Sequence, residues 1–417
     1  ENSMIPMFEE YQNTYKIESA NEIKPGLEAI QVAMEKLGSP QLAVPTIHVA
    51  GTNGKGSTIR MIERIAQEHG LTTATFMSPC IENVHDQIRL NGQSITPERM
   101  NRAFEEAKEA GLSGLLTEFE LLTVIAFIAI RQAKPDLAMI ESGMGGRFDS
   151  TNVVEPIVSV IPSIALEHTN FLGDTLEKIA WHKAGIIKKN GYAVIGEMPE
   201  TAQKVIEEEA HMQQATIKIN GKDFKVLDDT WSNEVICMSG LHPSLKGEHQ
   251  KRNMALAIQA FIEVAKVLHI ELVEDRVQQA VATTNLEGRF EQLASHVWLD
   301  GAHNPASARS LRKTIQQVLK GEKVTMVVGI LKDKDVEAVL RELEQVSDDF
   351  IFVAVEREQD RLMQPEELMK LSHAKHKQIA SSVLQAVQEK QKEGSVVVTG
   401  SLYLLAQWRS ILQQVLE

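Results

Sequence analysis

A glycine-rich turn between an apolar strand and a helix is the feature that most constrains the fold of this chain. Residues 45–50 form a short apolar run, and residues 57–69 have the pattern of a helix that ends at Gly70. Between them lies the sequence Gly51-Thr52-Asn53-Gly54-Lys55-Gly56-Ser57. In this setting a turn can direct backbone N–H groups and a helix N-terminus at phosphate oxygens. The pattern therefore predicts a phosphate site, with a plain glycine turn as the alternative.

The spacing of this turn differs from the common phosphate loop, G-x-x-x-x-G-K-[ST]. Gly56 is inserted between Lys55 and Ser57, and Val49 stands where the first glycine would be. Lys55 still supplies a mobile positive charge, and Ser57 or Thr58 can offer a hydroxyl to a magnesium ion. We therefore expect a nucleotide and Mg²⁺ to bind here.

The rest of the chain alternates short apolar strands with longer amphipathic helices, which predicts parallel sheets covered by helices. In the first part the expected strands are 72–77, 137–140 and 157–161, and the expected helices are 118–132, 175–187, 199–213 and 251–268. Residues 215–238 change to short alternating runs, which indicates a small antiparallel addition. A second block has expected strands at 297–299, 324–328, 350–353 and 395–398, and helices at 306–319 and 336–343.

These elements predict two α/β domains, which suits a length of 417 residues. The first, residues 4–294, is expected to be a phosphate-loop ATPase domain with a mainly parallel sheet and the small antiparallel addition. The second, residues 297–417, is expected to be a Rossmann-like α/β domain.

Composition narrows the classes of function and the cellular location. The net charge of −14 argues against a general nucleic-acid binder, although a pocket can still be locally positive. Two cysteines, Cys80 and Cys237, without a C-x-x-C pair argue against a disulfide framework or a zinc site and favour the cytoplasm. We see no signal peptide, and the longest apolar stretch, 121–130, is too short to span a bilayer, so we expect no membrane contact.

Glu141 ends the apolar run 137–140 and is a candidate metal ligand. Many phosphate-loop enzymes place a carboxylate beside the metal in this way. A solvated acid at a strand end, or the N-cap of a following turn, is the alternative. Ser78 likewise follows the expected strand 72–77, at a carboxyl strand end where open α/β sheets bind ligands.

Residues 48–58 closely resemble the signature of folylpolyglutamate synthases, which belong to the wider Mur-ligase-like superfamily of ATP-dependent amide-forming enzymes. The resemblance continues in order through residues 23–28, 141–152, 166–187, 287–290, 300–305, 329–335 and 399–403. One motif could be accidental, but an ordered series along most of the chain is specific.

The resemblance implies a role for each matching residue. It implies nucleotide contacts by Gly51, Thr52, Asn53, Gly54, Lys55, Gly56, Ser57, Thr58, Asn253, Arg289 and Asp300, and magnesium contacts by Ser57, Ser78, Glu141 and His168. It implies catalytic roles for Lys55, Lys183 and His303, with Lys183 carbamylated to N6-carboxylysine. From the residues alone, a structural histidine, a surface lysine or arginine, a helix cap and a loop acid stay open as alternatives. Asp300 and His303 fall in the second domain, which implies a cleft that closes to assemble the site.

The loop after Ser78 departs from the family pattern. Cys80 stands where the family commonly has histidine, and Asp86-Gln87 replaces Glu-Arg. The family's pterin contacts and loop salt bridges are therefore not carried over to this chain. Cys80 has no evident partner for a role as a nucleophile.

The implied reaction adds L-glutamate to the γ-carboxylate of a reduced folate through an acyl phosphate, at the expense of ATP. We expect a monomer that binds ATP, L-glutamate and the folate, and no nucleic acid. A bifunctional enzyme that also joins glutamate to dihydropteroate is the main alternative; Lys24-Pro25-Gly26 in place of an Asp-Leu-Gly-type sequence favours the single activity. Gly56 argues against a cell-wall peptide ligase, and the lack of an N-K-x-D motif against a switch GTPase. A pseudoenzyme, suggested by Cys80, is a further alternative.

Overall fold

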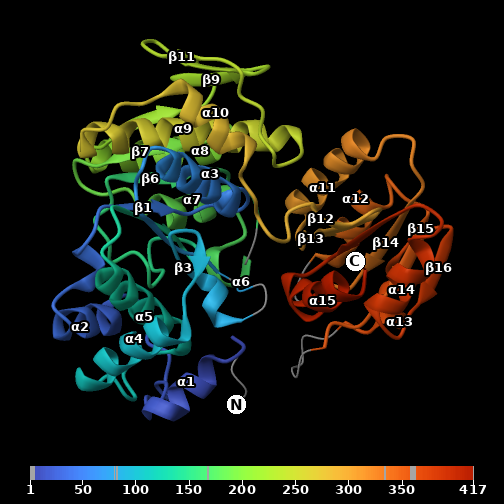
Figure 1. Cartoon of the computed structure of the whole chain (residues 1–417), viewed down its shortest axis with the longest axis horizontal. Coiled ribbons are helices and arrows are strands. Elements are labelled where there is room, and N and C mark those ends of the chain that lie inside the picture. The colour runs from blue at the N-terminus through green and yellow to red at the C-terminus, as the bar shows by residue number, and fades with distance from the viewer. Residues whose placement is uncertain are drawn as a thin grey trace.

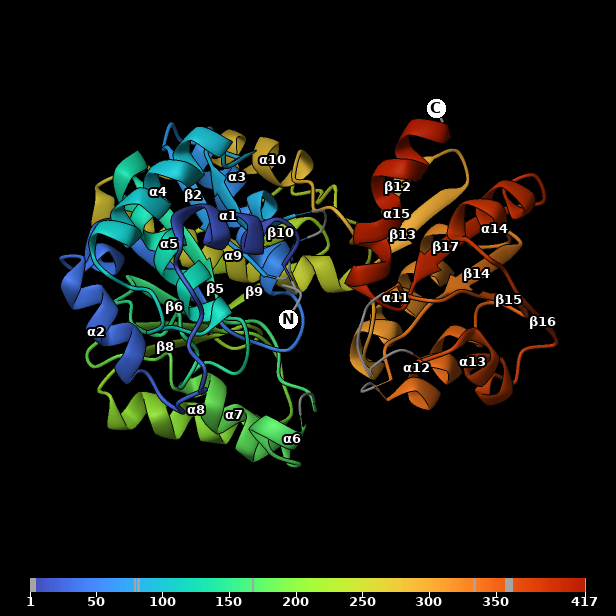
Figure 2. The same ribbon diagram turned by 90° about the horizontal axis from the view of Figure 1, so that it is seen from below.

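The computed structural model describes residues 5–78, 80, 83–166, 169–332, 335–356 and 363–416. The chain forms two α/β units that lie side by side, one around an eight-stranded sheet and the other around a six-stranded sheet (Figure 1). The perpendicular view in Figure 2 shows the same separation, with the C-terminal helix α15 on the second unit. The predicted fold class is confirmed.

The eight-stranded sheet has the order β4-β3-β2-β5-β1-β6-β7-β8. Its strands are β1 Thr46–Val49, β2 Thr73–Phe76, β3 Ile88–Leu90, β4 Gln93–Ser94, β5 Leu137–Glu141, β6 Val158–Ile161, β7 Tyr192–Ile195 and β8 Thr216–Ile219. All pairs are parallel except those made by β3 and β4. The central strands β1, β2, β5 and β6 are buried throughout, because helices cover both faces of the sheet.

Two layers of helices enclose this sheet, and two more helices pack near β6 and β7. One core joins the sheet to α3 Lys55–Glu68, α9 Glu248–Leu268 and α10 Glu274–Ala282. Another joins it to α1 Phe8–Tyr15, α2 Glu28–Lys36, α4 Pro97–Glu109 and α5 Glu118–Ala133, and a third holds α7 Leu176–Ala184 and α8 Glu200–Met212. The short helix α6 Thr169–Leu172 and the 3-10 turns η1 Pro40–Leu42 and η2 Val84–Gln87 complete the unit.

Helix α5 contains the longest apolar stretch of the sequence. Its residues 120–130 are all buried, which confirms the predicted buried helix. Thr117 and Glu120 form a capping box at its start, and each side chain satisfies a backbone N–H group that the first turn leaves unpaired. Among the described residues, no helix is both long and apolar enough to cross a membrane.

The expected antiparallel addition at 215–238 is only partly right. Strand β8 pairs in parallel with β7 and extends the main sheet. Only β9 Phe224–Leu227, β10 Thr230–Asn233 and β11 Cys237–Met238 form a separate antiparallel sheet. The Thr-Ile-Lys-Ile alternation of β8 arises because this edge strand is half-exposed, and alternation alone does not distinguish a parallel edge strand from a hairpin.

The second unit has the strand order β12-β13-β17-β14-β15-β16, in which only β12 is antiparallel to its neighbour. Its strands are β12 Glu291–Ala294, β13 Val297–Asp300, β14 Val324–Val328, β15 Asp349–Phe352, β16 His376–Ile379 and β17 Ser395–Thr399. Its helices are α11 Pro305–Val318, α12 Val336–Leu343, α13 Pro365–Leu371, α14 Val383–Lys390 and α15 Leu402–Val415. Separate cores hold α11 to α13 against the sheet and α14 with α15 against it.

The connection between the units runs from the end of α10 at Ala282 to the start of β12 at Glu291. The predicted division, 4–294 and 297–417, assigns β12 to the first domain, whereas β12 pairs with β13 in the second sheet. We therefore propose to place the domain boundary in residues 283–290, which we call the linker.

Candidate active site

The carboxyl ends of the central strands bring the main candidate residues of the first unit together. Val49, the last residue of β1, lies opposite Glu141, the last residue of β5, in the parallel ladder. The backbone N–H of Ser78, after β2, donates to Glu141 Oε1 at 3.3 Å. Lys55 Nζ lies 3.4 Å from the carbonyl oxygen of Ser142. The glycine-rich loop, Ser78 and Glu141 therefore share one edge of the sheet, where open α/β sheets bind ligands.

The glycine-rich loop is held in shape by the segment that follows β6. Thr52 N–H donates to the Ser163 carbonyl at 3.0 Å, and Thr52 Oγ1 donates to the Ala165 carbonyl at 3.1 Å. Asn53 N–H donates to Ser163 Oγ at 2.9 Å. Helix α3 then begins at Lys55, so the N–H groups of its first turn point toward the space above the loop. This geometry can bind an anion.

The two glycines that flank Lys55 differ in how closely other atoms approach them. Gly54 has φ +88°, and a Cβ at this position would lie 2.5 Å from Asn253 Oδ1. A Cβ at Gly56 would lie 3.1 Å from Met77 Cε and 3.5 Å from Leu286 Cδ2. The inserted Gly56 thus lets the start of α3 pack closely against β2's end and the linker.

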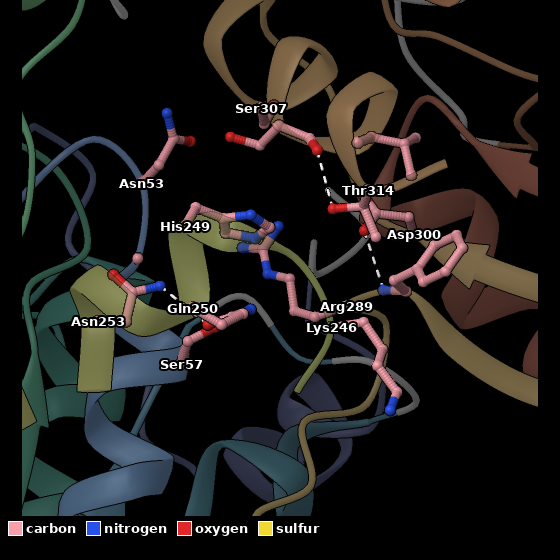
Figure 3. Close-up of a pocket in the computed structure, with 14 residues that line it drawn as sticks. Asn53, Ser57, Lys246, His249, Gln250, Asn253, Arg289, Asp300, Ser307 and Thr314 are labelled. Carbon is pink, nitrogen blue, oxygen red and sulfur yellow. Dashed lines mark hydrogen bonds between the residues drawn. The ribbon is translucent and has the colours of Figure 1, made fainter. Parts of the chain in front are cut away.

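A pocket between the two units collects six of the predicted nucleotide contacts (Figure 3). These six are Asn53, Gly54, Ser57, Asn253, Arg289 and Asp300. The other lining residues, which the sequence did not reveal, are Lys246, His249, Gln250, Phe290, Ser307, Ser310, Leu311 and Thr314. The one available signal was helical spacing: His249, Gln250 and Asn253 lie on one face of α9, since residues three and four apart are neighbours.

Gln250 joins the glycine-rich loop to Asn253. Its Nε2 donates to Ser57 Oγ at 3.2 Å, and its Oε1 accepts from Asn253 Nδ2 at 3.0 Å. Gln250 is 3% exposed, so this amide pair is well shielded from water. The pair directs Asn253 Oδ1 toward Gly54.

Arg289 acts on two buried carboxylates, Glu141 of the first unit and Asp300 of the second. Burial raises the pKa of Glu141, while Lys55, the Ser78 N–H, Arg289 and Arg60 oppose the rise. Burial also raises the pKa of Asp300, opposed by Arg289 and by the N–H groups of Ala302 and Phe290. Those two N–H groups donate to Asp300 at 2.8 and 2.9 Å and fix its carboxylate.

The donor groups near Glu141 fit a magnesium ion. Glu141 is 4% exposed, and burial raises the pKa of its carboxyl. The hydroxyls of Ser57 and Ser78 supply further hard oxygen atoms, which Mg²⁺ prefers. No group of three or more His, Cys, Asp or Glu side chains able to hold a metal occurs in the described part of the chain.

Lys183 and His303, both predicted site residues, do not line the pocket. Lys183, in α7, is 1% exposed and packs closely against Gly146, which belongs to the stretch 141–152. A Cβ placed on Gly146 would lie 3.2 Å from the Cα of Lys183. His303 precedes α11; its Nδ1 lies 2.9 Å from the Gly301 carbonyl oxygen, and its backbone N–H donates to Ser307 Oγ. His168 lies outside the described residues.

Cys80 is buried, and burial together with Asp86 raises the pKa of its thiol to about 12. A thiol protonated at neutral pH is a poor nucleophile. Asp86, which replaces the family's usual glutamate, instead forms a capping box with Asn83 at the start of η2.

His249, which lines the pocket, is expected to make the free energy of unfolding depend on pH. Burial and the nearby Arg252, Arg289 and Lys313 lower its pKa to about 4. In the unfolded chain a histidine has a pKa of about 6.5, whereas folded His249 takes up its proton only near pH 4. Protonation therefore favours the unfolded state, and the free energy of unfolding falls as the pH drops from about 6.5 to 4. We expect H249Q, in nucleotide-free protein, to lose less unfolding free energy than the parent over this range. Urea unfolding at pH 7.5, 6 and 5 measures the difference; parallel losses would contradict the assignment.

Comparison with known proteins supplies a family. Residues 49–261 match the Mur ligase middle domain, and residues 283–411 match the dihydrofolate synthetase C-terminal domain. The chain is 32% identical to the dihydrofolate synthase/folylpolyglutamate synthase of Bacillus subtilis, over 94% of this chain and 96% of the relative. It is also 32% identical to the folylpolyglutamate synthase of Lacticaseibacillus casei, over 92% and 93%.

Solved structures agree with these matches. Escherichia coli FolC in complex with DHPP and ADP is similar with a TM-score of 0.88 and 29% identity, covering 98% of both chains. Mycobacterium tuberculosis folylpolyglutamate synthase, complexed with ADP and AMPPCP, gives a TM-score of 0.85 at 29% identity, covering 93% of this chain and 95% of that one. With its glycine-rich loop, its buried acid at the end of β5 and its second α/β unit, the chain belongs to the folylpolyglutamate synthase/dihydrofolate synthase family of Mur-type ATP-dependent ligases.

Proposed function

We propose that this chain adds L-glutamate to the γ-carboxylate of a reduced folate, with cleavage of ATP to ADP and phosphate. The observation that carries the proposal is the pocket between the units, where the glycine-rich loop and Asn253 of the first unit face Asp300 of the second across Arg289. Relatives of the same fold bind ADP, and one of them also binds DHPP.

ATP binding would use the groups that line this pocket and the loop. The N–H groups of the loop and of the first turn of α3 bind phosphate oxygens, and Lys55 neutralises part of their charge. Arg289 reaches the phosphates with a forked, permanently charged group, while Asn253 and Asp300 orient the rest of the nucleotide. A magnesium ion held by Glu141, Ser57, Ser78 and His168 would supply charge neutralisation at the phosphates.

Glutamate addition then takes two displacements. A γ-carboxylate oxygen of the folate bonds to the terminal phosphorus of ATP, and the bond to the ADP oxygen breaks. The amine of L-glutamate bonds to the acyl-phosphate carbon, the amine loses a proton, and the carbon–phosphate oxygen bond breaks to release phosphate. In both steps the protein's main contribution is to align the reactants, to exclude water from them and to neutralise their charge.

His303 is the candidate catalytic group of the second unit. Its Nδ1 hydrogen-bonds a backbone carbonyl, which only accepts, so the neutral ring carries its proton on Nδ1. Its Nε2 then has a lone pair suited to accept a proton, such as that of the attacking amine. Closure of the two units would bring this group to the substrate.

Lys183 is proposed to be carbamylated, which converts a buried cation into an anion that can bind metal. We expect activity to fall when the enzyme is freed of dissolved CO₂ at mildly acidic pH, and to return on addition of bicarbonate. The intact mass should rise by the mass of one CO₂ under conditions that preserve carbamates. K183R should show neither the mass change nor the bicarbonate response. Bicarbonate-independent activity of the parent would refute the modification.

The assay that tests the function measures glutamate-dependent release of ADP from purified protein with a tetrahydrofolate. No ADP release would overturn the proposed ligase. A parallel assay with dihydropteroate tests the bifunctional alternative, which is favoured by the relatives that carry both names. Lys24-Pro25-Gly26 favours the single activity, and product formation from dihydropteroate would show that choice to be wrong. The cytoplasmic location and monomeric state stay predictions; sedimentation at micromolar concentration tests the latter.

A further inference from the structure

The linker between the units carries a half-buried carboxylate, Glu287, in an ion pair with an arginine from the first unit. Glu287 Oε2 lies 2.5 Å from Arg89 Nη2, on strand β3, and the two side chains are only 23% and 15% exposed. The residues are 198 positions apart in the chain. The contact therefore ties the connection between the units to one particular strand.

Arginines from both units surround Glu287. Burial by itself would raise the pKa of its carboxyl, but Arg89, Arg60 and Arg409 together hold that pKa below its ordinary value. Arg60 belongs to α3, which starts at the glycine-rich loop, and Arg409 belongs to α15 of the second unit. Arg409 itself makes a two-point contact with Glu291 of β12, at 2.8 and 2.7 Å. Glu287 is thus the acid at the junction of the two units.

Arg89 and Arg60 both lie beside Thr75 of β2, and only Arg60 hydrogen-bonds its side chain. Arg89 lies opposite Thr75 in the β2–β3 ladder. Arg60, which is 5% exposed, donates through Nη1 to Thr75 Oγ1 at 3.2 Å and to Glu63 Oε1 at 3.0 Å. Arg89 also donates to the carbonyl of Asp86 at 3.4 Å, at the end of the loop that follows Ser78. Glu287 is therefore paired with Arg89 and lies within the electrostatic influence of Arg60, and each arginine makes a further contact within the first unit.

Glu287 lies only two residues before Arg289 in the linker. Gly288 has φ +75°, and its carbonyl accepts from the N–H of Gly301 at 2.8 Å. The next residue but one, Phe290, donates its N–H to Asp300. Arg289 stands between these two anchors and lines the nucleotide pocket (Figure 3). Because both anchors belong to the second unit, the Arg89–Glu287 contact ties the segment that carries Arg289 to the first unit.

We infer that Arg89 and Glu287 are positioning residues: their ion pair sets the place of the linker, and thereby holds Arg289 against the nucleotide. The inference rests on the proposed role of Arg289 in ATP binding. If the ion pair only stabilised the fold, its loss would lower the free energy of unfolding and leave ADP affinity unchanged. The two roles therefore predict different results.

The experiment compares R89Q, E287Q and the double variant with the parent, using calorimetric titration with ADP and magnesium. Each single variant is expected to weaken ADP binding about tenfold, and the double variant to be no weaker than the worse single variant, because both lose the same contact. The KM for ATP should rise more than the KM for folate or glutamate. The control is R131Q with E106Q, an arginine–glutamate pair that joins α5 to α4, is more exposed at 27% and 33%, and does not line the pocket. These control variants should lower the thermal midpoint without changing ADP affinity.

A charge reversal sharpens the test. R89E combined with E287R restores opposite charges but presents a cation to Arg60 and Arg409, so it should fail to recover ADP affinity. E287D keeps the charge on a shorter side chain and should fold if E287Q does not; it is expected to show a smaller loss of ADP affinity. Unchanged ADP affinity in folded R89Q and E287Q, or additive losses in the double variant, would overturn the inference. ADP binding is measured without turnover, so a chain that binds ADP but ligates no glutamate would refute the proposed function and leave this inference standing.

Discussion

Gly54→Ala should reduce ADP affinity more than about a hundredfold while leaving the protein folded. The backbone at Gly54 has φ +88°, which costs a residue with a Cβ about 1–2 kcal/mol. The added Cβ would also lie 2.5 Å from Asn253 Oδ1. Relief requires either the loop or Asn253 to move, and both line the pocket proposed to bind the nucleotide. Calorimetric titration with ADP and magnesium measures the loss.

Gly70→Ala is the matched control, because Gly70 follows the same helix, α3, at its other end. It has φ +84°, but nothing lies within 4 Å of a Cβ placed there. The substitution therefore carries the backbone strain alone. We expect it to cost about 1 kcal/mol of unfolding free energy and to leave ADP affinity unchanged. Equal ADP affinities for the two alanine variants would contradict the proposed loop geometry.

Glu141→Gln should lower kcat by about a thousandfold or more and remove the effect of magnesium on nucleotide affinity. Glutamine keeps the shape of the side chain but lacks the charge that the metal site needs. The matched control is E263Q, a buried carboxylate of α9 paired with Lys266 and absent from the pocket lining. E263Q should keep the parent's magnesium response. A normal kcat for E141Q would exclude Glu141 as the metal ligand.

The same variant should stabilise the protein when metal and nucleotide are absent. Burial raises the folded-state pKa of Glu141 above its unfolded value, so the folded state binds its proton more tightly. The contribution of this group to stability is therefore full at low pH and declines as the pH rises through the folded-state pKa. At neutral pH the ionised carboxylate costs free energy, and glutamine removes that cost. Thermal unfolding at pH 5 and pH 8 should show a gain for E141Q that is larger at the higher pH.

Local chain order explains which parts of the site the sequence could predict. A phosphate loop lies within one strand–turn–helix segment, and an acid such as Glu141 directly follows its strand. Parallel packing then brings the carboxyl ends of neighbouring strands to one edge without further information. The roles of Lys183 and His303 rested on resemblance, and they stay predictions.

The other wall of the pocket could not be found in this way. Ser307, Ser310 and Thr314 lie on α11 of the second unit, and they reach the pocket only through the relative placement of the two units. His249 and Gln250 have a helical spacing signal, but polar residues on a helix face are usually solvated. The sequence alone gave no reason to assign them to a ligand.

Long-range polar contacts and the direction of strand pairing could not be predicted from the sequence either. Arg89 and Glu287 are separated by 198 residues, and no periodic pattern links them. Strand β8 alternates like a hairpin strand because it lies half-exposed at the edge of the sheet, so its parallel pairing was missed. Gly56 is the opposite case: it is unusual in sequence, and in the structure a Cβ at this position would lie 3.1 Å from the flexible end of Met77.

Oxygen transfer from the folate to phosphate tests the central claim most directly. The substrate is prepared with ¹⁸O in its γ-carboxylate and incubated with the enzyme, ATP, magnesium and L-glutamate. An acyl-phosphate route predicts that each released phosphate carries one oxygen from that carboxylate, matched one to one with the new amide bond. Released phosphate without the label, in the presence of amide product, would contradict the proposed mechanism.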